Sequence, residues 1–133
     1  MIVIDASSLA KYILREEDWR EVRDYLLNAY SNTLALAEVS NSIWKHQILH
    51  EAASNKEVRL MFSALKKLKE EVVIFEPFEK YLEDAFEISM NMKITFYDAV
   101  YMAQAKKHDG LLTSDEKQWR AAEKMGIKVK YVD

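Results

Sequence analysis

Short β-like runs separated by helix-length segments constrain the fold of this chain more than any other feature of its sequence. The pattern predicts four strands and a possible fifth, at Met1–Ile4, Thr33–Leu36, Val72–Phe75, Leu111–Thr113 and Val129–Val132. Strands that alternate with helices favour a parallel sheet covered by helices on both faces, because parallel strands need long crossover connections. The predicted element order is βαα-βαα-βαα-βα-β, which is an α/β fold.

The segments between the strands repeat their apolar residues with the period of a helix. Helices are predicted over Ala6–Leu14, Trp19–Tyr30, Glu38–Ile48, Val58–Leu68, Phe78–Met92, Phe96–Lys107 and Asp115–Met125. Ser54 and Glu57 have the spacing of a capping box, which predicts that the fourth helix starts near this point. Gly126 is typical of the residue that ends a helix.

Length and composition narrow the class of protein. The 133 residues fit one domain, which we expect to span residues 1–133, and only two Gly and one Pro argue against a β-sandwich or barrel. The absence of Cys excludes disulfides and cysteine zinc sites and is compatible with the cytoplasm, where we expect the protein. No apolar run reaches the ~18 residues needed to span a bilayer, so no membrane partner is expected. The net charge of −3 predicts that any contact with nucleic acid is local and metal-assisted.

Four acidic residues stand where parallel sheets bind ligands, which is beyond the carboxyl ends of the strands. Asp5 directly follows the first predicted strand, Glu38 follows the second by two residues, and Asp115 follows the fourth. Asp98 lies in the first turn of a helix that could cross the same edge. We therefore expect the four carboxylates to lie close together.

Carboxylates gathered at one edge repel each other unless a cation or protons neutralise them. Mg²⁺ and Mn²⁺ prefer oxygen ligands, and no His or Cys accompanies these acids. A cluster of this kind therefore predicts Mg²⁺ or Mn²⁺ rather than zinc.

A structural interpretation of the same acids stays open. Asp5 can cap the helix that follows it, and Asp98 and Glu116 each close a sequence with capping-box spacing. Acids near a helix N-terminus are also favoured by the helix dipole. Glu38 and Lys45 lie on one face of a predicted helix, and exposure of that face to solvent would be enough to explain its polar residues.

Four blocks in the chain resemble, in order, the motif blocks of PIN domains. They are Met1-Ile-Val-Ile-Asp5-Ala-Ser-Ser8, Leu36-Ala-Glu38-Val-Ser-Asn41, Thr95-Phe-Tyr-Asp98-Ala-Val-Tyr101-Met-Ala103 and Leu111-Leu-Thr-Ser-Asp115. Within that family the sequence is most similar to VapC-type toxins of prokaryotic toxin–antitoxin pairs. The resemblance implies a three-layer α/β/α fold with a central, mostly parallel sheet of four to five strands. It also implies an Mg²⁺- or Mn²⁺-dependent ribonuclease that cleaves RNA with a metal-activated water.

The resemblance assigns roles to particular residues. The family's acidic positions match the catalytic and metal-binding candidates Asp5, Glu38, Asp98 and Asp115, and supporting polar positions match Ser7, Asn41 and Thr113. Asp5 and Asp98 are the expected direct ligands of the principal ion, and the other two acids would act through water or a second ion. The family also implies a homodimer and a cognate antitoxin that enters the acidic pocket.

Basic residues near the four motifs could supply affinity for RNA. Candidates are Lys11, Arg15, Lys45, Lys117 and Arg120. Charges exposed only to solvent are the simpler interpretation of each.

Other functional classes share single features of this sequence. Phosphatases of the haloacid dehalogenase type would use Asp5 as a covalent nucleophile, but they carry a second Asp where this chain has Ser7. His46 and His50 have the spacing of a helical zinc pair, but the glutamate of that motif is Gln47 here, and surface histidines are the better interpretation. His108 is predicted in a frayed helix end. A PIN-like domain that only binds RNA or serves as a scaffold also remains possible.

Overall fold

The computed structural model describes residues 1–133 and contains a five-stranded sheet in which all neighbouring strands are parallel. The strand order is β3-β2-β1-β4-β5. The strands are β1 (Ile2–Ile4), β2 (Ala29–Asn32), β3 (Ile74–Glu76), β4 (Leu111–Thr113) and β5 (Val129–Tyr131). This confirms the predicted α/β class, the element order and the fifth strand.

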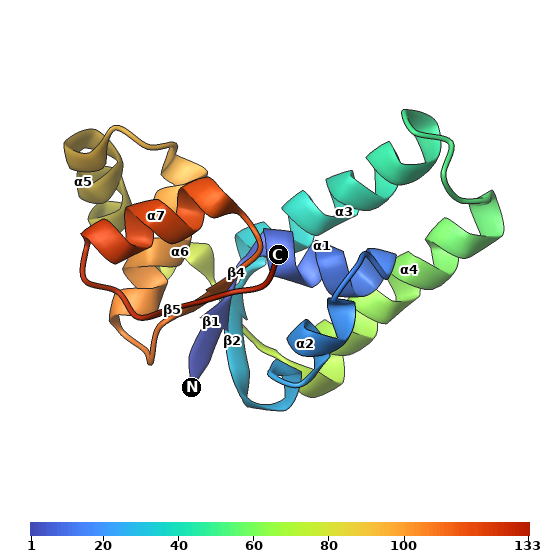
Figure 1. The fold of residues 1–133 in the computed structure, drawn as a ribbon, viewed down its shortest axis with the longest axis horizontal. Helices are drawn as coiled ribbons and strands as arrows, with labels where there is room; N and C mark the ends of the chain where they lie inside the picture. Colours follow the sequence, from blue (N-terminus) through green and yellow to red (C-terminus); the bar gives the residue numbers. More distant parts are fainter.

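The helices form a layer on each side of the sheet, and the two layers appear as two lobes with a saddle between them (Figure 1). One layer holds α1 (Ala6–Leu14), α2 (Trp19–Arg23), α3 (Thr33–Ile48) and α4 (Asn55–Lys67). The other holds α5 (Leu82–Met92), α6 (Phe96–Lys106) and α7 (Glu116–Lys124). The chain builds the sheet outward from β1 to β3 and then crosses to β4, so the strand order reverses between β1 and β4. Right-handed crossovers place the connections before and after that reversal on opposite faces.

Burial on both faces explains why the central strands are apolar throughout. Val3, Ile4, Leu111 and Leu112 are completely buried. A parallel strand covered on both sides shows no alternation of polar and apolar residues. No helix is long and apolar enough to cross a membrane.

The second strand is the main error of the sequence prediction. The predicted strand Thr33–Leu36 is the first turn of α3, and the strand is Ala29–Asn32 instead. The predicted helix over Trp19–Tyr30 stops at Arg23 and is followed by a short 3₁₀ turn before the strand. The strand was obscured by its polar sequence Ala-Tyr-Ser-Asn, in which the buried Ser31 hydroxyl donates to the Ile4 carbonyl at 2.8 Å.

Smaller differences have local causes. A single π-helical turn runs to Val72, so the third strand begins two residues later than predicted, and the helix predicted from Phe78 opens with a 3₁₀ turn. The capping box of Ser54 and Glu57 is confirmed, with both reciprocal hydrogen bonds present. Gly126 has a φ of 75° just beyond α7, as expected for a residue that ends a helix.

Candidate active site

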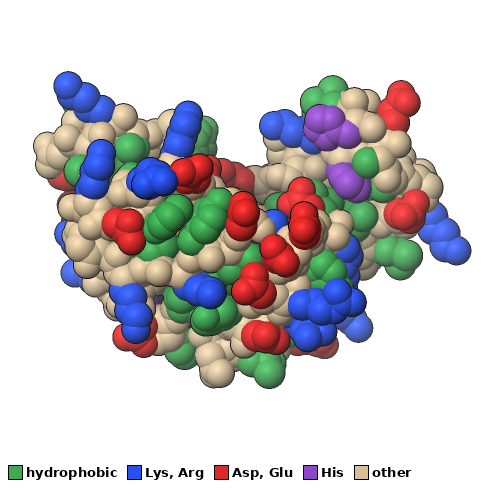
Figure 2. All heavy atoms as spheres, in the orientation of Figure 1, with side chains coloured by type: hydrophobic (Ala, Val, Ile, Leu, Met, Phe, Trp, Pro, Cys, Tyr) green, Lys and Arg blue, Asp and Glu red, His purple; other side chains and the backbone are tan.

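Four helices begin at the carboxyl edge of the sheet, and each carries one of the predicted acids near its start. Asp5 caps α1 and Asp115 caps α7, next to the reversal of strand order. Asp98 lies in the first turn of α6, which starts at this edge because it leads back to β4. Glu38 lies in the second turn of α3 rather than at a helix start, because the helix begins earlier than predicted. Acidic side chains gather in the saddle between the two lobes (Figure 2).

Asp5 is the most buried of these acids, with 3% of its surface exposed. Its Oδ1 accepts hydrogen bonds from the Ser7 hydroxyl at 2.6 Å and the Ser8 backbone N–H at 3.1 Å, and its Oδ2 accepts one from the Thr113 hydroxyl. Burial raises the pKa of Asp5 to about 6, and the nearby Asp115 adds to the rise, although the three hydrogen bonds oppose it. Neutral donors therefore hold this carboxylate in place without neutralising it.

Glu38 is fixed by a tyrosine from the opposite helical layer. The Tyr101 hydroxyl of α6 donates to Glu38 Oε1 at 2.6 Å. Burial raises the pKa of Glu38, with a further rise from Asp98, and the hydrogen bond from Tyr101 opposes both. Burial also raises the pKa of Tyr101 well above its usual range, with contributions from Glu38, Asp5 and Asp98. Tyr101 thus connects the two helical layers at the acidic edge, which is the part of the carboxyl edge that carries Asp5, Glu38, Asp98 and Asp115.

Asp98 and Asp115 complete the group from the other side of the sheet. Burial raises the pKa of Asp98, and Asp115 raises it further against the effects of Thr95 and Lys117. Oδ1 of Asp115 accepts from the backbone N–H groups of Lys117 and Gln118, as an N-terminal cap does. Asp98 and Asp115 therefore serve helix starts, as the structural interpretation predicts, and they also lie close enough for Asp115 to raise the pKa of Asp98.

The donor set fits a hard divalent cation better than zinc. The oxygens at this edge come from carboxylates and hydroxyls, and Mg²⁺ and Mn²⁺ bind such ligands. Glu38 Oε2 and Asp115 Oδ2 accept no hydrogen bond, and Asp5 Oδ2 accepts only one. As the side chains lie, no three acidic or histidine groups form a ligand set for one metal ion. Neighbouring acids nevertheless raise the pKa values of Asp5, Glu38 and Asp98, so these carboxylates are gathered at one edge of the sheet.

The supporting residues predicted from the sequence divide into two kinds. Ser7 and Thr113 both donate to Asp5, whereas Asn41 is exposed on α3 and its side chain makes no hydrogen bond. The sequence analysis did not assign roles to Tyr101 or Ser114. Tyr101 follows Asp98 by three residues, which puts both on one helix face, and that spacing is a signal that could have identified it.

Most of the basic candidates have local partners. The Lys11 ammonium donates to the Glu17 carbonyl at 2.9 Å, the Arg15 guanidinium lies over the rings of Tyr12 and Trp19, and Arg120 pairs with Glu116. The ammonium groups of Lys45 and Lys117 make no hydrogen bond. His50 lies beyond the end of α3, so it does not form a helical zinc pair with His46.

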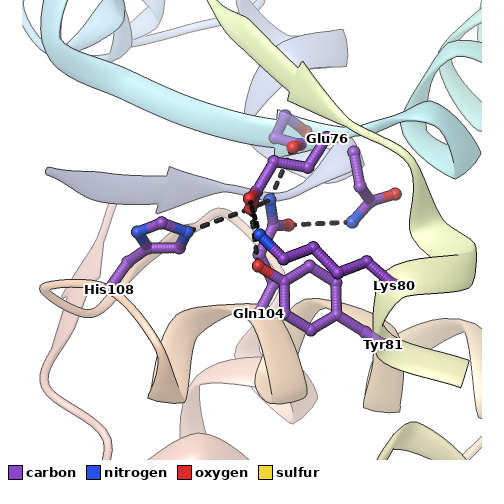
Figure 3. A network of polar contacts seen from close by, with 7 residues as sticks. Glu76, Lys80, Tyr81, Gln104 and His108 are labelled. Atoms are coloured by element: carbon purple, nitrogen blue, oxygen red, sulfur yellow. Dashed lines mark hydrogen bonds and ion pairs between the residues drawn. The ribbon is translucent and has the colours of Figure 1, made fainter. Parts of the chain in front are cut away.

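A second polar cluster, centred on Glu76, was not predicted (Figure 3). Glu76 ends β3, and its Oε1 is bonded to Tyr81 at 2.6 Å, to Gln104 at 3.0 Å and to His108 at 2.9 Å, while Lys80 donates to Oε2 at 2.8 Å. Burial alone would raise the pKa of Glu76, but these hydrogen bonds lower it to about 2. The predicted helix end near His108 is confirmed, since α6 stops at Lys106, but the His108 side chain is held in place, because its ring stacks on Tyr30 with centroids 4.0 Å apart.

Comparisons with known proteins agree with this geometry. Residues 2–124 match the PIN domain family. "Ribonuclease VapC3" of Pyrobaculum aerophilum is 31% identical over 123 residues, which are 88% of this chain and 90% of that protein. "Exonuclease VapC9" of the same organism is 24% identical over 130 residues, which are 96% of this chain and 89% of that protein.

A solved structure shares the fold. "Crystal structure of PAE2754 from Pyrobaculum aerophilum" matches with a TM-score of 0.62 and 23% identity, over 96% of this chain and 89% of that one. Because the family match covers nearly the whole sequence and the first relative is similar over nearly its whole length, this chain belongs to the PIN-domain family and is VapC-like.

Proposed function

We propose that this protein is a divalent-metal-dependent endoribonuclease whose catalytic and metal-binding residues are Asp5, Glu38, Asp98 and Asp115. The observation that carries the proposal is a carboxylate, Asp5, that is 3% exposed and faces other acids without a basic side chain among its hydrogen-bond donors. Burying an ionised carboxylate without a cationic partner costs desolvation free energy, and this cost points to a functional reason for the residue. A buried acid with a raised pKa beside further acids is typical of a functional site.

A bound Mg²⁺ or Mn²⁺ would supply a nucleophilic water at neutral pH and would offset the negative charge of the phosphodiester. Asp5 and Asp98 would hold the principal ion, Asp5 through the lone pairs of Oδ2 that Thr113 leaves free. Asp115 would contribute its free Oδ2, directly or through a water.

Glu38 has a different role in this proposal. The Tyr101 hydroxyl donates to Glu38 Oε1 and leaves Oε2 as the free acceptor. The raised pKa of Glu38 suits a group that takes a proton from the attacking water. Ser7 and Thr113 are positioning residues, because they hold the Asp5 carboxylate in one orientation.

A covalent role for Asp5 is disfavoured by its contacts. Its Oδ1 already accepts two hydrogen bonds, its Oδ2 accepts one, and only 3% of the residue is exposed, so the carboxylate can reach a small cation but is poorly placed to attack a phosphate as the nucleophile of a phosphatase would. A phosphatase of the haloacid dehalogenase type is therefore the weaker alternative.

We further propose that the protein is the toxin of a toxin–antitoxin pair, acts on RNA in the cytoplasm, and forms a homodimer held inactive by its antitoxin. Support comes from the names of the two relatives and from apolar side chains left on the surface. On α5 and the start of α6 the exposed apolar residues include Phe86, Met90 and Tyr97, and on α3 and α4 they include Trp44 and Phe62. Exposed apolar groups of this size mark surfaces that a partner covers.

The proposal is tested with a labelled single-stranded RNA and titrated Mn²⁺ or Mg²⁺. The wild type should cleave the RNA only when metal is present, and Asp5→Asn and Glu38→Gln should each cut the rate at least ~100-fold. Glu87→Gln on α5 is the matched control, because it removes one exposed charge remote from the acidic edge and should leave the rate unchanged. Turnover of a small phosphomonoester by a protein that leaves RNA intact would contradict the nuclease assignment.

A further inference from the structure

A pocket of about 350 Å³ opens between α1 and α3, beside the acidic edge. Its lining includes Lys11, Lys45, His46, His50, Ser7 and Ser114. In the sequence these residues stand in separate segments, where the lysines are predicted as surface charges, the histidines as surface histidines and Ser7 as a supporting residue, and Ser114 has no predicted role. The fold brings them to one wall because α1 and α3 pack against each other. The volume is within the range of ~300–1,000 Å³ typical of pockets that hold small ligands.

The chemistry of this lining is that of an anion site. Two ammonium groups and two imidazoles can donate hydrogen bonds, several serine hydroxyls accompany them, and Glu16 is the one carboxylate on the wall. Lys11 is 8% exposed and gives one N–H to the Glu17 carbonyl, which leaves two for a ligand. Lys45 makes no ion pair at all. The pocket is therefore locally positive on a chain whose net charge is −3.

The pocket and the acidic edge share a wall. The Ser7 hydroxyl, which lines the pocket, donates to Asp5 at 2.6 Å and accepts from the Ser114 backbone N–H at 2.9 Å. Figure 2 shows histidine side chains on the lobe formed by α3 and α4, next to the acidic side chains of the saddle. An anion bound in the pocket would therefore lie beside the metal ion that Asp5 is proposed to hold.

We propose that this pocket binds an RNA phosphate adjacent to the one that is cleaved, an inference that rests on the proposed nuclease function. RNA carries a phosphate at every nucleotide, so one strand can place one phosphate at the carboxylates and the next among the lysines and histidines. Phosphate contacts of this kind position the strand and do not read its sequence. The pocket explains how a net acidic protein with an acidic catalytic edge gains affinity for a polyanion.

The test uses the double variant Lys45→Ala, His50→Ala, because both side chains are exposed and make no hydrogen bond that the fold requires. The matched control is Lys106→Ala, Lys107→Ala, which removes two exposed lysines from the end of α6, away from the acidic edge. Affinity for a fluorescent single-stranded RNA is measured at several salt concentrations with Mn²⁺ present, in an Asp98→Asn background that prevents cleavage. The pocket variant should bind about 10-fold more weakly and lose about one unit of the log–log salt slope, and the control should do neither. Lys45→Arg in place of the alanine should restore the slope.

A second measurement separates this inference from the proposed function. Without Asp98→Asn, the pocket variant should show a raised KM for the long RNA, with unchanged cleavage of a dinucleotide too short to reach the pocket. An unchanged affinity and salt slope would overturn the subsite even if the wild type cleaves RNA. If the wild type cleaves no RNA but the pocket variant still loses RNA affinity, the pocket binds RNA phosphate, but its place beside a cleaved phosphate fails together with the nuclease assignment. Lost affinity for a polyglutamate peptide with intact RNA binding would also overturn it, in favour of an acidic protein ligand.

Discussion

The protein buries two groups of polar residues around carboxylates, and their chemistry is opposite. Glu76 has a side chain that is 12% exposed and receives four hydrogen bonds, one of them from the ammonium of Lys80, and its pKa falls to about 2. Asp5 is 3% exposed and receives three bonds from neutral donors while facing other acids, and its pKa rises to about 6. Burial acts on both groups in the same direction, so the supply of donors and cations decides the sign of the shift.

This difference separates a structural carboxylate from a functional one. The Glu76 cluster is satisfied by the protein itself, and it connects β3 to the turn after it, to the last turn of α6 and to the segment that follows α6 (Figure 3). The acidic edge has carboxylate oxygens that accept no hydrogen bond, and its negative charges raise one another's pKa values, so a cation from outside the chain would supply what the protein does not. The contrast leads to five predictions, which run from the largest expected effect to the smallest.

Removing a charge from the acidic edge should destroy activity without harming the fold. Asp98→Asn should lower RNA cleavage by about 100- to 1,000-fold, because it removes part of one ion-binding unit. The apo variant should be as stable as the wild type or more stable, since a repulsion with Asp115 disappears. Cleavage kinetics and thermal melts of the same preparations check both parts. A destabilised variant with unaltered cleavage would show that Asp98 serves only its helix start.

The pH dependence of apo stability should have a maximum at about pH 4, because the two carboxylates act in opposite senses and their unfolded pKa values meet there. Asp5 has a folded pKa of about 6 against ~3.9 unfolded, so its contribution is present at low pH and is lost as the pH rises through 6. Glu76 has a folded pKa of about 2 against ~4.3 unfolded, so its contribution is lost as the pH falls through that range. Asp5→Asn should remove a loss of up to about 3 kcal/mol that occurs between about pH 4 and about pH 6. Urea unfolding in EDTA across pH 3–8 measures this.

Metal should reverse the high-pH arm of that curve. A divalent ion that binds only the folded protein stabilises it, and it binds the ionised carboxylates, so millimolar Mn²⁺ should raise the melting midpoint more at pH 7.5 than at pH 5. An equal response at both pH values, or none, would mean that the acidic edge binds no cation.

The two clusters also differ in how far the sequence could reveal them. Asp5 and Asp115 were predicted together because parallel strands end at one edge, a rule that needs only the strand assignments. The Glu76 cluster was not predicted, because its members are spread from residue 76 to residue 108 and no periodic pattern connects them. Its neighbour β2 was also misplaced, since Ser31 and Asn32 are buried polar residues whose partners, Ile4 and Gln104, come from distant segments. Local patterns predict elements and edges, whereas hydrogen bonds between distant segments emerge only in the folded chain.

Breaking the satisfied cluster should affect stability and spare the chemistry. Glu76→Ala leaves Lys80, Tyr81 and His108 without their acceptor and should cost about 2 kcal/mol, allowing for the exposure of Lys80. Cleavage per folded molecule should stay at the wild-type level at temperatures well below the melting midpoint. Lys69→Ala, which removes an exposed charge from the preceding turn, is the control and should cost less than about 0.5 kcal/mol. A large loss of activity in folded Glu76→Ala would mean that the two clusters are coupled.

The smallest expected effect lies in the hydrogen bond that reaches the acidic edge from α6. Tyr101→Phe keeps the buried ring and removes only the hydroxyl that donates to Glu38 at 2.6 Å. The lost bond opposed the rise of the Glu38 pKa, so that pKa should rise further, and the acidic limb of the pH–rate profile should move to higher pH. The rate at neutral pH should fall about 3- to 10-fold, which corresponds to about 1 kcal/mol. A merely structural hydroxyl would lower stability and leave the limb of the pH–rate profile in place. Glu38→Gln combined with Tyr101→Phe gives the decisive comparison, because a hydroxyl that acts only through the Glu38 carboxylate adds nothing once that carboxylate is gone.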